Sequence, residues 1–187
     1  MADKSKYLKG QLLLDSGELA GSFFARTVVL ICQHDSEGAF GLVLNRPANK
    51  KLGEVIDAEL PEALRGQPLY VGGPVQPTTL SYLHSDTDGT ENEIMDRLTM
   101  GHSLYDLLVL GGDLKGERRV KAFAGYAGWA PGQLEGEMRR KAWIVQPARL
   151  DLIFDVEPDN LWRKILRSAG GWKNHLLAEM PEDPSVN

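Results

Sequence analysis

Residues 27–47 read TVVLICQHDSEGAFGLVLNRP, and this stretch decides the fold. Two of its segments, Thr27–Gln33 and Ala39–Asn45, are apolar and rich in branched residues, which is typical of buried strands. A polar turn separates them, and Gly38 can adopt the positive φ that such a turn requires. Pro47 ends the second segment because proline cannot donate a hydrogen bond to a neighbouring strand. The stretch therefore predicts a β-hairpin.

The rest of the chain alternates irregularly between short apolar runs and segments with helical spacing. Further strands are predicted at Gln11–Asp15, Pro68–Gly72, Thr79–His84, Arg118–Gly125, Ala142–Gln146 and Leu150–Phe154. Helices are predicted over Leu52–Leu60 and Ser103–Leu110, and from Pro131 and Pro158 onward. A doubly wound sheet would show regular strand–helix alternation, so an α+β fold around one mixed sheet is the better prediction.

The length of 187 residues favours one domain. We expect a flexible N-terminus over residues 1–9, a folded domain over residues 10–169 and a C-terminal tail over residues 170–187. The tail prediction rests on the Gly-, Pro- and acid-containing composition after Gly170.

The chain carries 21 basic and 26 acidic residues, a formal charge of −5. This balance argues against general nucleic-acid binding and against recruitment to an anionic membrane surface. The longest apolar run is too short for a secretory signal or a membrane span. A single cysteine, Cys32, excludes a disulfide framework and suits a reducing compartment. We therefore expect a cytoplasmic protein with no membrane association.

Cys32 and His34 are the first candidates for chemistry. Because they are two residues apart on a predicted strand, they should share one face, where they could form a nucleophile and base or two metal ligands. The alternative is that Cys32 is a core residue and His34 bonds to turn backbone. No second cysteine and no histidine spacing supports a metal site, so the structural reading is favoured and neither a metal nor a cofactor is expected.

Asn45 and Arg46 close the hairpin. The arginine could clamp a carboxylate or phosphate in a bidentate manner, with the asparagine orienting it. Alternatively, the pair caps the strand end and Arg46 forms an ion pair with an acidic helix.

Gly72-Gly73-Pro74 follows a predicted strand and has a tightly specified backbone. Adjacent N–H groups at the two glycines could form an anion-binding nest. The segment lacks the spacing of a phosphate loop or dinucleotide fingerprint, so a rigid loop is favoured.

Residues 125–137, GYAGWAPGQLEGE, place two aromatic residues among small ones just before a predicted helix. Tyr126, Trp129 and Gln133 could form a binding surface at the positive end of that helix. A structural role is equally compatible with the pattern, and a catalytic role is weaker because no nucleophile–base pair is visible.

Two basic clusters, Lys115–Lys121 and Arg139–Lys141, are short and are interrupted by or close to acidic residues. A solvated face explains them better than a contact patch.

Several of these motifs, in this order, resemble the AlgH/YqgE family. The resemblance is carried by residues 28–47, Gly72–Val75, Gly125–Trp129 with Pro131–Glu135, and Leu152–Asp155 before Leu161-Trp162. It covers about Gly10 to Ala169. It implies a single α+β domain with a branched, barrel-like sheet and packed helices, in a bacterial cytosolic protein without an established enzymatic activity. The family also carries a transcriptional-regulator label.

The leading hypothesis is a non-enzymatic binding or regulatory module whose partner is a protein or a small molecule. Its functional face would gather the candidates already discussed: His34, Asn45, Arg46, Gly72, Gly73, Pro74, Tyr126, Trp129 and Gln133. The alternative is an enzyme acting on a small anionic substrate, with His34 as acid or base and Arg46 as anion clamp. Direct DNA binding is not expected, because no helix-turn-helix with a basic recognition helix is visible.

Overall fold

The computed structural model describes residues 7–85, 92–112 and 118–181. In chain order these form β1 (Gln11–Asp15), β2 (Val28–Asp35), β3 (Gly38–Val43), β4 (Pro47–Lys51), α1 (Leu52–Val55), α2 (Glu62–Arg65), β5 (Pro68–Val71), β6 (Val75–His84), β7 (Glu93–Met95), β8 (Leu98–Gly101), α3 (Leu104–Gly112), β9 (Val120–Trp129), α4 (Gln133–Arg139), β10 (Trp143–Pro147), α5 (Leu150–Phe154), α6 (Pro158–Ala169) and α7 (Trp172–Glu179).

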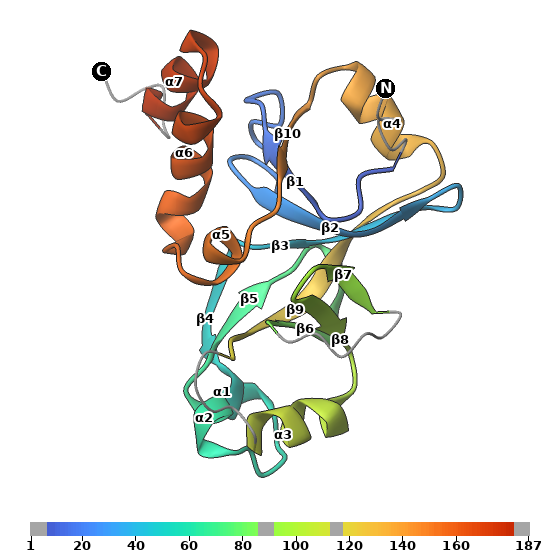
Figure 1. Cartoon of the computed structure of the whole chain (residues 1–187), viewed down its shortest axis with the longest axis vertical. Helices are drawn as coiled ribbons and strands as arrows, with labels where there is room; N and C mark the ends of the chain where they lie inside the picture. The colour runs from blue at the N-terminus through green and yellow to red at the C-terminus, as the bar shows by residue number, and fades with distance from the viewer. Residues whose placement is uncertain (1–6, 86–91, 113–117, 182–187) are drawn as a thin grey trace.

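Strand β9 is the branch point of the sheet (Figure 1). Residues 120–126 pair with antiparallel β6 on one side, and residues 122–124 pair with parallel β5 on the other. Residues 127–129 pair with β3, from which the sheet continues through β2 and β1 to β10. Beyond β6 lie β8 and β7, and β4 pairs with β5. The predictions of a mixed, branched sheet and an α+β fold are confirmed.

The sheet curls into a half-barrel, and its strands β1 and β2 are buried on both faces. Leu12 and Leu14 of β1 belong to one apolar cluster and Leu13 to another, because successive side chains of a strand point to opposite faces. The first cluster lies under α5 and α6 and the second under α4. A third cluster, which includes Leu64 and Leu107, lies under α1–α3 at the lower end of Figure 1.

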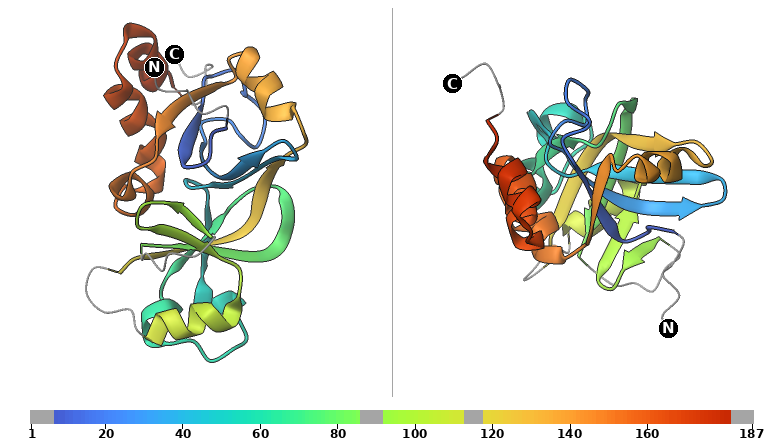
Figure 2. Two further views of the ribbon diagram at one scale, coloured as in Figure 1. Left: turned by 45° about the vertical axis from the view of Figure 1, so that its right-hand side comes forward. Right: turned by 90° about the horizontal axis from the view of Figure 1, so that it is seen from above.

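Helices α6 and α7 stand side by side along one flank of the molecule (Figure 2). Helix α6 turns a strongly apolar face toward the sheet, where Leu161, Trp162, Ile165 and Leu166 are buried. Gly170 and Gly171 join the two helices with φ values of 69° and 83°, which glycine adopts without steric cost.

Helix α7 corrects the expectation of a tail over residues 170–187. Ala178 of α7 is buried, and Arg163 of α6 donates a hydrogen bond from Nε to its carbonyl oxygen at 3.2 Å. The chain is therefore ordered against α6 as far as Glu179. Residues 1–6 and 182–187, which belong to the predicted termini, lie outside the described part of the chain.

The run Leu150–Phe154 was predicted as a strand but forms helix α5. Hydrogen bonds from the N–H of Ile153 to Arg149 O and from the N–H of Asp155 to Asp151 O, at 3.1 and 2.9 Å, are helical. A five-residue apolar run does not distinguish a buried strand from a short buried helix.

The helix predicted over Leu52–Leu60 is also shorter than expected. Helix α1 ends at Val55 because Ile56 is extended, and α2 begins only after Pro61. Strands β4, β7 and β8 were not predicted. None of the described helices is long and apolar enough to cross a membrane.

Candidate functional site

The predicted site residues do not form one face. His34, Trp129 and Gln133 lie at the α4 end of the β2–β3 hairpin, whereas Asn45 and Arg46 lie beyond its opposite end. Between these two groups, the glycine loop packs against Gly125 and Tyr126 of β9. The candidates therefore occupy three separate places in the fold.

His34 is held by backbone and by helix α4. Its side chain is buried, and its Nδ1 accepts a hydrogen bond of 3.0 Å from the backbone N–H of Leu8. Its Nε2 lies 3.4 Å from Oε1 of Glu135. A nitrogen that accepts a hydrogen bond carries no proton, so the neutral ring presents its proton at Nε2, toward Glu135. This arrangement anchors residues 7–8 to the hairpin and gives no substrate access to the ring.

Cys32 does not share a face with His34, which corrects the prediction. Ile31 pairs with Gly41 and Gln33 with Phe40, so Cys32 is the extra residue of a β-bulge. The bulge reverses the alternation after Cys32, so the thiol points into the cluster under α5 and α6 while His34 lies on the α4 side. Burial raises the pKa of the Cys32 thiol above its usual range, partly offset by Lys9.

Trp129 and Gln133 stabilise the junction between β9 and α4. The indole N–H of Trp129 donates to Oε2 of Glu137 at 2.9 Å. The amide of Gln133 accepts from the N–H of Ala130 and donates to Oε1 of Glu137, both at 3.1 Å. These polar groups therefore serve the local structure.

The glycine loop is a close crossing of two chain segments. A Cβ on Gly72 would lie 2.3 Å from the carbonyl oxygen of Gly125, and one on Gly73 would lie 2.1 Å from that of Tyr126. The N–H of Gly72 donates to Ala124 O at 2.9 Å and so cannot contribute to an anion nest. Pro74 follows the crossing in an exposed position. This geometry supports the rigid-loop interpretation.

Asn45 and Arg46 both act on the segment before β2. The Asn45 amide is buried, accepts from the N–H of Val28 at 2.8 Å and donates to the carbonyl oxygen of Arg26 at 2.9 Å. Arg46 donates from Nη2 to the carbonyl oxygen of Ala25. The two residues therefore hold residues 25–28 in place.

Arg26 is the centre of this arrangement. Its φ is 55°, in the left-handed region, which is uncommon for residues other than glycine. Its N–H donates to Oδ2 of Asp15 at 2.7 Å, and its guanidinium lies over the Trp162 ring, 5.2 Å from the centroid. Its Nη2 donates to the carbonyl oxygens of Met180 and Pro181 at 2.8 and 2.5 Å. Asp15 thus holds the backbone of Arg26, while Trp162 of α6 and the chain after α7 hold its guanidinium.

Two cavities meet at this guanidinium, and Arg26, Arg46 and Trp162 line both of them. One has a volume of about 370 Å³ and extends along the start of α6, where Asn45, Asp159 and Arg163 complete its mainly polar wall. The other has a volume of about 400 Å³ and reaches the end of α7. We call the pair the arginine cavity. It is the candidate functional site.

The sequence indicated Asn45 and Arg46 but not the other members of this site. Arg26 stands in the run Phe23-Phe24-Ala25-Arg26-Thr27 before β2, and its position depends on contacts with Trp162 and Met180, which are far away in sequence. Trp162 was predicted as a core residue of α6, and it is buried, but one edge of it faces the cavity. No local signal marks either residue as part of a site.

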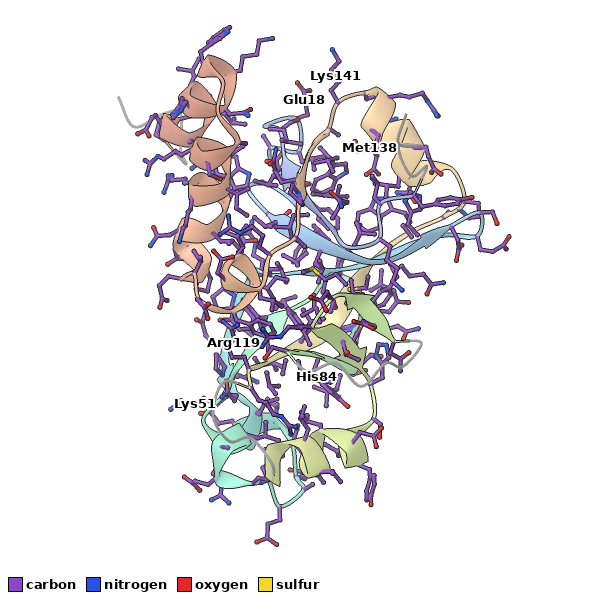
Figure 3. The ribbon with its side chains drawn as sticks, viewed as in Figure 1. Glu18, Lys51, His84, Arg119, Met138 and Lys141 are labelled. Atoms are coloured by element: carbon purple, nitrogen blue, oxygen red, sulfur yellow. The ribbon has the colours of Figure 1, made fainter. Side chains whose placement is uncertain are left out.

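The basic residues do not form one surface. Figure 3 shows Lys141 at the top of the molecule near α4 and Arg119 in its lower half. Arg119 forms a bidentate contact with Asp155 at 2.6 and 2.5 Å, and Lys121 is buried. In the described ranges, no group of three or more histidine, cysteine, aspartate or glutamate side chains is placed to hold a metal ion.

Fold and site together define a class of protein: an α+β domain with a curled, branched sheet and a cavity lined by arginines. A family model described as AlgH-like matches residues 12–174. The chain belongs to this family, which confirms the resemblance found in the sequence.

Relatives and solved structures agree with that membership. UPF0301 proteins from Chlorobium luteolum and Chlorobaculum tepidum are each 37% identical, covering 95% and 100% of this chain and 94% and 100% of their own lengths. The solution structure of the AlgH protein from Pseudomonas aeruginosa matches with a TM-score of 0.75 and 30% identity, over 97% of this chain and 98% of that one. A crystal structure from Corynebacterium diphtheriae, 23% identical, shows the same fold with a TM-score of 0.77, over 95% of each chain.

Proposed function

We propose that this chain is a cytosolic binding module that takes up a small anionic molecule in the arginine cavity, and that it is not an enzyme. The observation that carries the proposal is the placement of the Arg26 and Arg46 guanidinium groups on the wall of one cavity. Arginine presents a planar set of N–H donors that matches carboxylate and phosphate oxygens.

The backbone of Arg26 supports this interpretation. A left-handed conformation costs a residue with a side chain roughly 1 kcal/mol, and such strain persists where several contacts enforce it. Here Asp15, Asn45 and Trp162 enforce it. Strained residues of this kind concentrate at binding and catalytic sites.

The two hydrogen bonds from Nη2 of Arg26 to the end of the chain after α7 would not prevent binding. Nη2 donates to neutral backbone carbonyl oxygens of Met180 and Pro181. Hydrogen bonds from a guanidinium to an anion are roughly twice as strong as those between neutral groups. An anion in the cavity would therefore compete effectively with the end of α7 for this guanidinium.

A binding role is better supported than acid–base catalysis. The enzyme hypothesis needs His34 to reach a substrate, but the ring is buried between Leu8 and Glu135. Arg46 lies at the opposite end of the hairpin from His34, so these two residues would not act on one substrate.

A regulatory role of this protein would run through the bound molecule or a protein partner. Direct contact with DNA is disfavoured by the net charge of −5 and by the separation of Arg119 from Lys141.

Titration calorimetry with inorganic phosphate and with succinate as probes tests the proposal. We expect saturable binding of at least one probe to the unaltered protein, and binding at least about tenfold weaker in Arg46→Gln, since a hydrogen bond to a charged group contributes about 1.5–3 kcal/mol. Arg149→Gln is the matched control, because Arg149 is exposed and pairs with Asp151 outside the cavity. Equal affinities in the protein and in both variants, or no saturable binding, would contradict the proposal.

A further inference from the structure

A second cavity lies on the other half of the molecule, where α1–α3 cover the sheet. It has a volume of about 750 Å³ and shares no lining residue with the arginine cavity. Leu69 of β5, Leu80 of β6 and Ala124 of β9 form part of its floor, and Val55 and Leu104 lie on its helical side. We call it the apolar cavity.

Helix α3 packs closely against α2 near its C-terminal end, whereas Leu104 at its N-terminal end lines the cavity. At Gly111 the helix is so close to α2 that a Cβ would lie 2.3 Å from Cδ1 of Leu64. At its other end Leu104 is 37% exposed, and across the opening Val55 is 40% exposed. The apolar sheet between these ends is therefore covered incompletely, and the opening has apolar edges.

The size and lining fit a small molecule. Ligand sites usually enclose about 300–1,000 Å³ and combine mainly apolar walls with a few polar groups. Here the polar groups are Lys50, Asp57, Thr78 and His102. The apolar walls thus fit a ligand with an apolar body, and the polar groups determine which polar head group at the end of that body would bind.

Lys50 and Asp57 set the charge of that head. Lys50 precedes Lys51, which Figure 3 labels, at the end of β4. In the part of the chain that the structure describes, Lys50 forms no ion pair. One anionic group would give this ammonium a partner. The carboxylate of Asp57 on the same wall would repel a second negative charge.

From this combination we propose that the apolar cavity binds a small amphipathic molecule that carries a single anionic group on an apolar body. The site goes beyond the proposed function, because it uses a separate cavity and the opposite balance of apolar and charged contacts. The arginine cavity selects for charge, whereas the apolar cavity selects for a buried hydrocarbon or aromatic body.

Two probes test the proposal directly. The first is anilinonaphthalene sulfonate, an aromatic body with one sulfonate, whose fluorescence rises in apolar sites. The second is dodecanoate, which should displace it, with dodecyltrimethylammonium as a probe of similar chain and opposite charge. We expect saturable binding of the dye at one site, displacement by dodecanoate, and displacement at least about threefold weaker by the cationic probe.

Variants then locate the site. Ala48→Phe adds a ring to the wall from the edge strand β4 and should weaken dye binding at least about tenfold. The exposed Ala130 lies outside this cavity, so Ala130→Phe should bind like the unaltered protein. Lys50→Gln should reduce the preference for dodecanoate over the cationic probe by about threefold, and Lys164→Gln on the exposed side of α6 should not.

A measurement without substitutions keeps the test independent of folding defects. Backbone amide resonances of residues 48–58, 78–80 and 102–104 should shift on addition of dodecanoate, and those of residues 25–28 should not. Absence of saturable binding, or shifts confined to the arginine cavity, would overturn the proposal. So would shifts in the apolar cavity that follow protein concentration alone, because they would identify a contact between two copies of the chain. Failure of phosphate or succinate to bind would bear only on the proposed function.

Discussion

Trp129 and Trp143 share one hydrogen-bond acceptor: their indole N–H groups lie 2.9 and 2.8 Å from the same oxygen, Oε2 of Glu137. Trp129 belongs to β9 and Trp143 to β10, strands that do not pair with each other. One carboxylate on α4 therefore joins two strands that approach the helix from different parts of the sheet.

Removing that carboxylate should be costly. Both tryptophans are almost fully buried, so Glu137→Ala leaves two indole donors without an acceptor and should lower the free energy of unfolding by at least about 2 kcal/mol. Urea denaturation measures the loss. Glu179→Ala is the control, because Glu179 is an exposed partner of Arg167 and its loss should cost at most about 1 kcal/mol. Equal losses in the two variants would contradict the shared-acceptor role.

Lys121 should make stability rise with pH in a defined window. The residue is 7% exposed, and its ammonium lies 4.1 Å from the Tyr70 ring centroid and donates to the carbonyl oxygen of Ile153. Burial lowers the pKa of Lys121 to about 8, an effect that Glu157 partly opposes. Between pH 8 and about 10.4 the unfolded chain therefore binds more protons at this residue than the folded chain, and the free energy of unfolding increases with pH.

The variant Lys121→Met isolates this contribution. From pH 8 to pH 10.4, the free energy of unfolding of the unaltered protein should rise by roughly 3 kcal/mol relative to that of the variant. It should stay constant below pH 7, where Lys121 is protonated in both states. A difference that is flat across the whole range would show that the folded state does not lower the pKa.

Gly73 should tolerate no side chain. A Cβ there would meet the backbone of Tyr126 at 2.1 Å, and backbone cannot move aside as a flexible side chain can. Gly73→Ala should therefore lower the free energy of unfolding by at least about 3 kcal/mol. Gly66→Ala, at a position with nothing within 4 Å of the new Cβ, should change it by less than about 1 kcal/mol. Equal melting temperatures for the two variants would contradict the close contact between Gly73 and the backbone of Tyr126.

Cys32 should be chemically silent in the folded protein. Burial raises the pKa of its thiol, and the thiolate is the reactive form. We expect a disulfide reagent at pH 8 to label the native protein about a hundredfold or more slowly than the denatured protein. Because the chain has one cysteine, the labelled fraction reports on Cys32 alone. Equal rates would mean that the thiol is accessible.

Most of the sheet could be predicted because its strands are marked by local patterns. The hairpin of β2 and β3 appears as two apolar runs around a glycine turn, and both strands form where they were predicted. Helix α5 was mistaken for a strand because Leu152 and Ile153 are buried in a run too short to show a period. Helix α7 was missed because its apolar residues do not share one face: Trp172 and Leu176 are exposed, whereas Ala178 is buried.

The candidate site could be predicted only in part, for a different physical reason. Asn45 and Arg46 are polar residues directly after an apolar run, and such a pattern can be recognised in the sequence. The extra residue at Cys32 reverses the side-chain alternation, and nothing in the sequence announces such a bulge. Arg26 acquires its role from residues distant in the chain, so only the folded structure identifies it.

The central position of β9 has a consequence for synthesis of the chain. The free edge of β3 pairs with residues 127–129 of β9, so residues 44–126 must be made before this partner appears. At translation rates of about 5–20 residues per second, this takes on the order of 4–17 s. During that time the hairpin has an unpaired strand edge, and such an edge can pair with another chain and start aggregation. Productive folding of this protein on the ribosome should therefore depend on chaperones that protect the first third of the chain until the strand at its centre has been made.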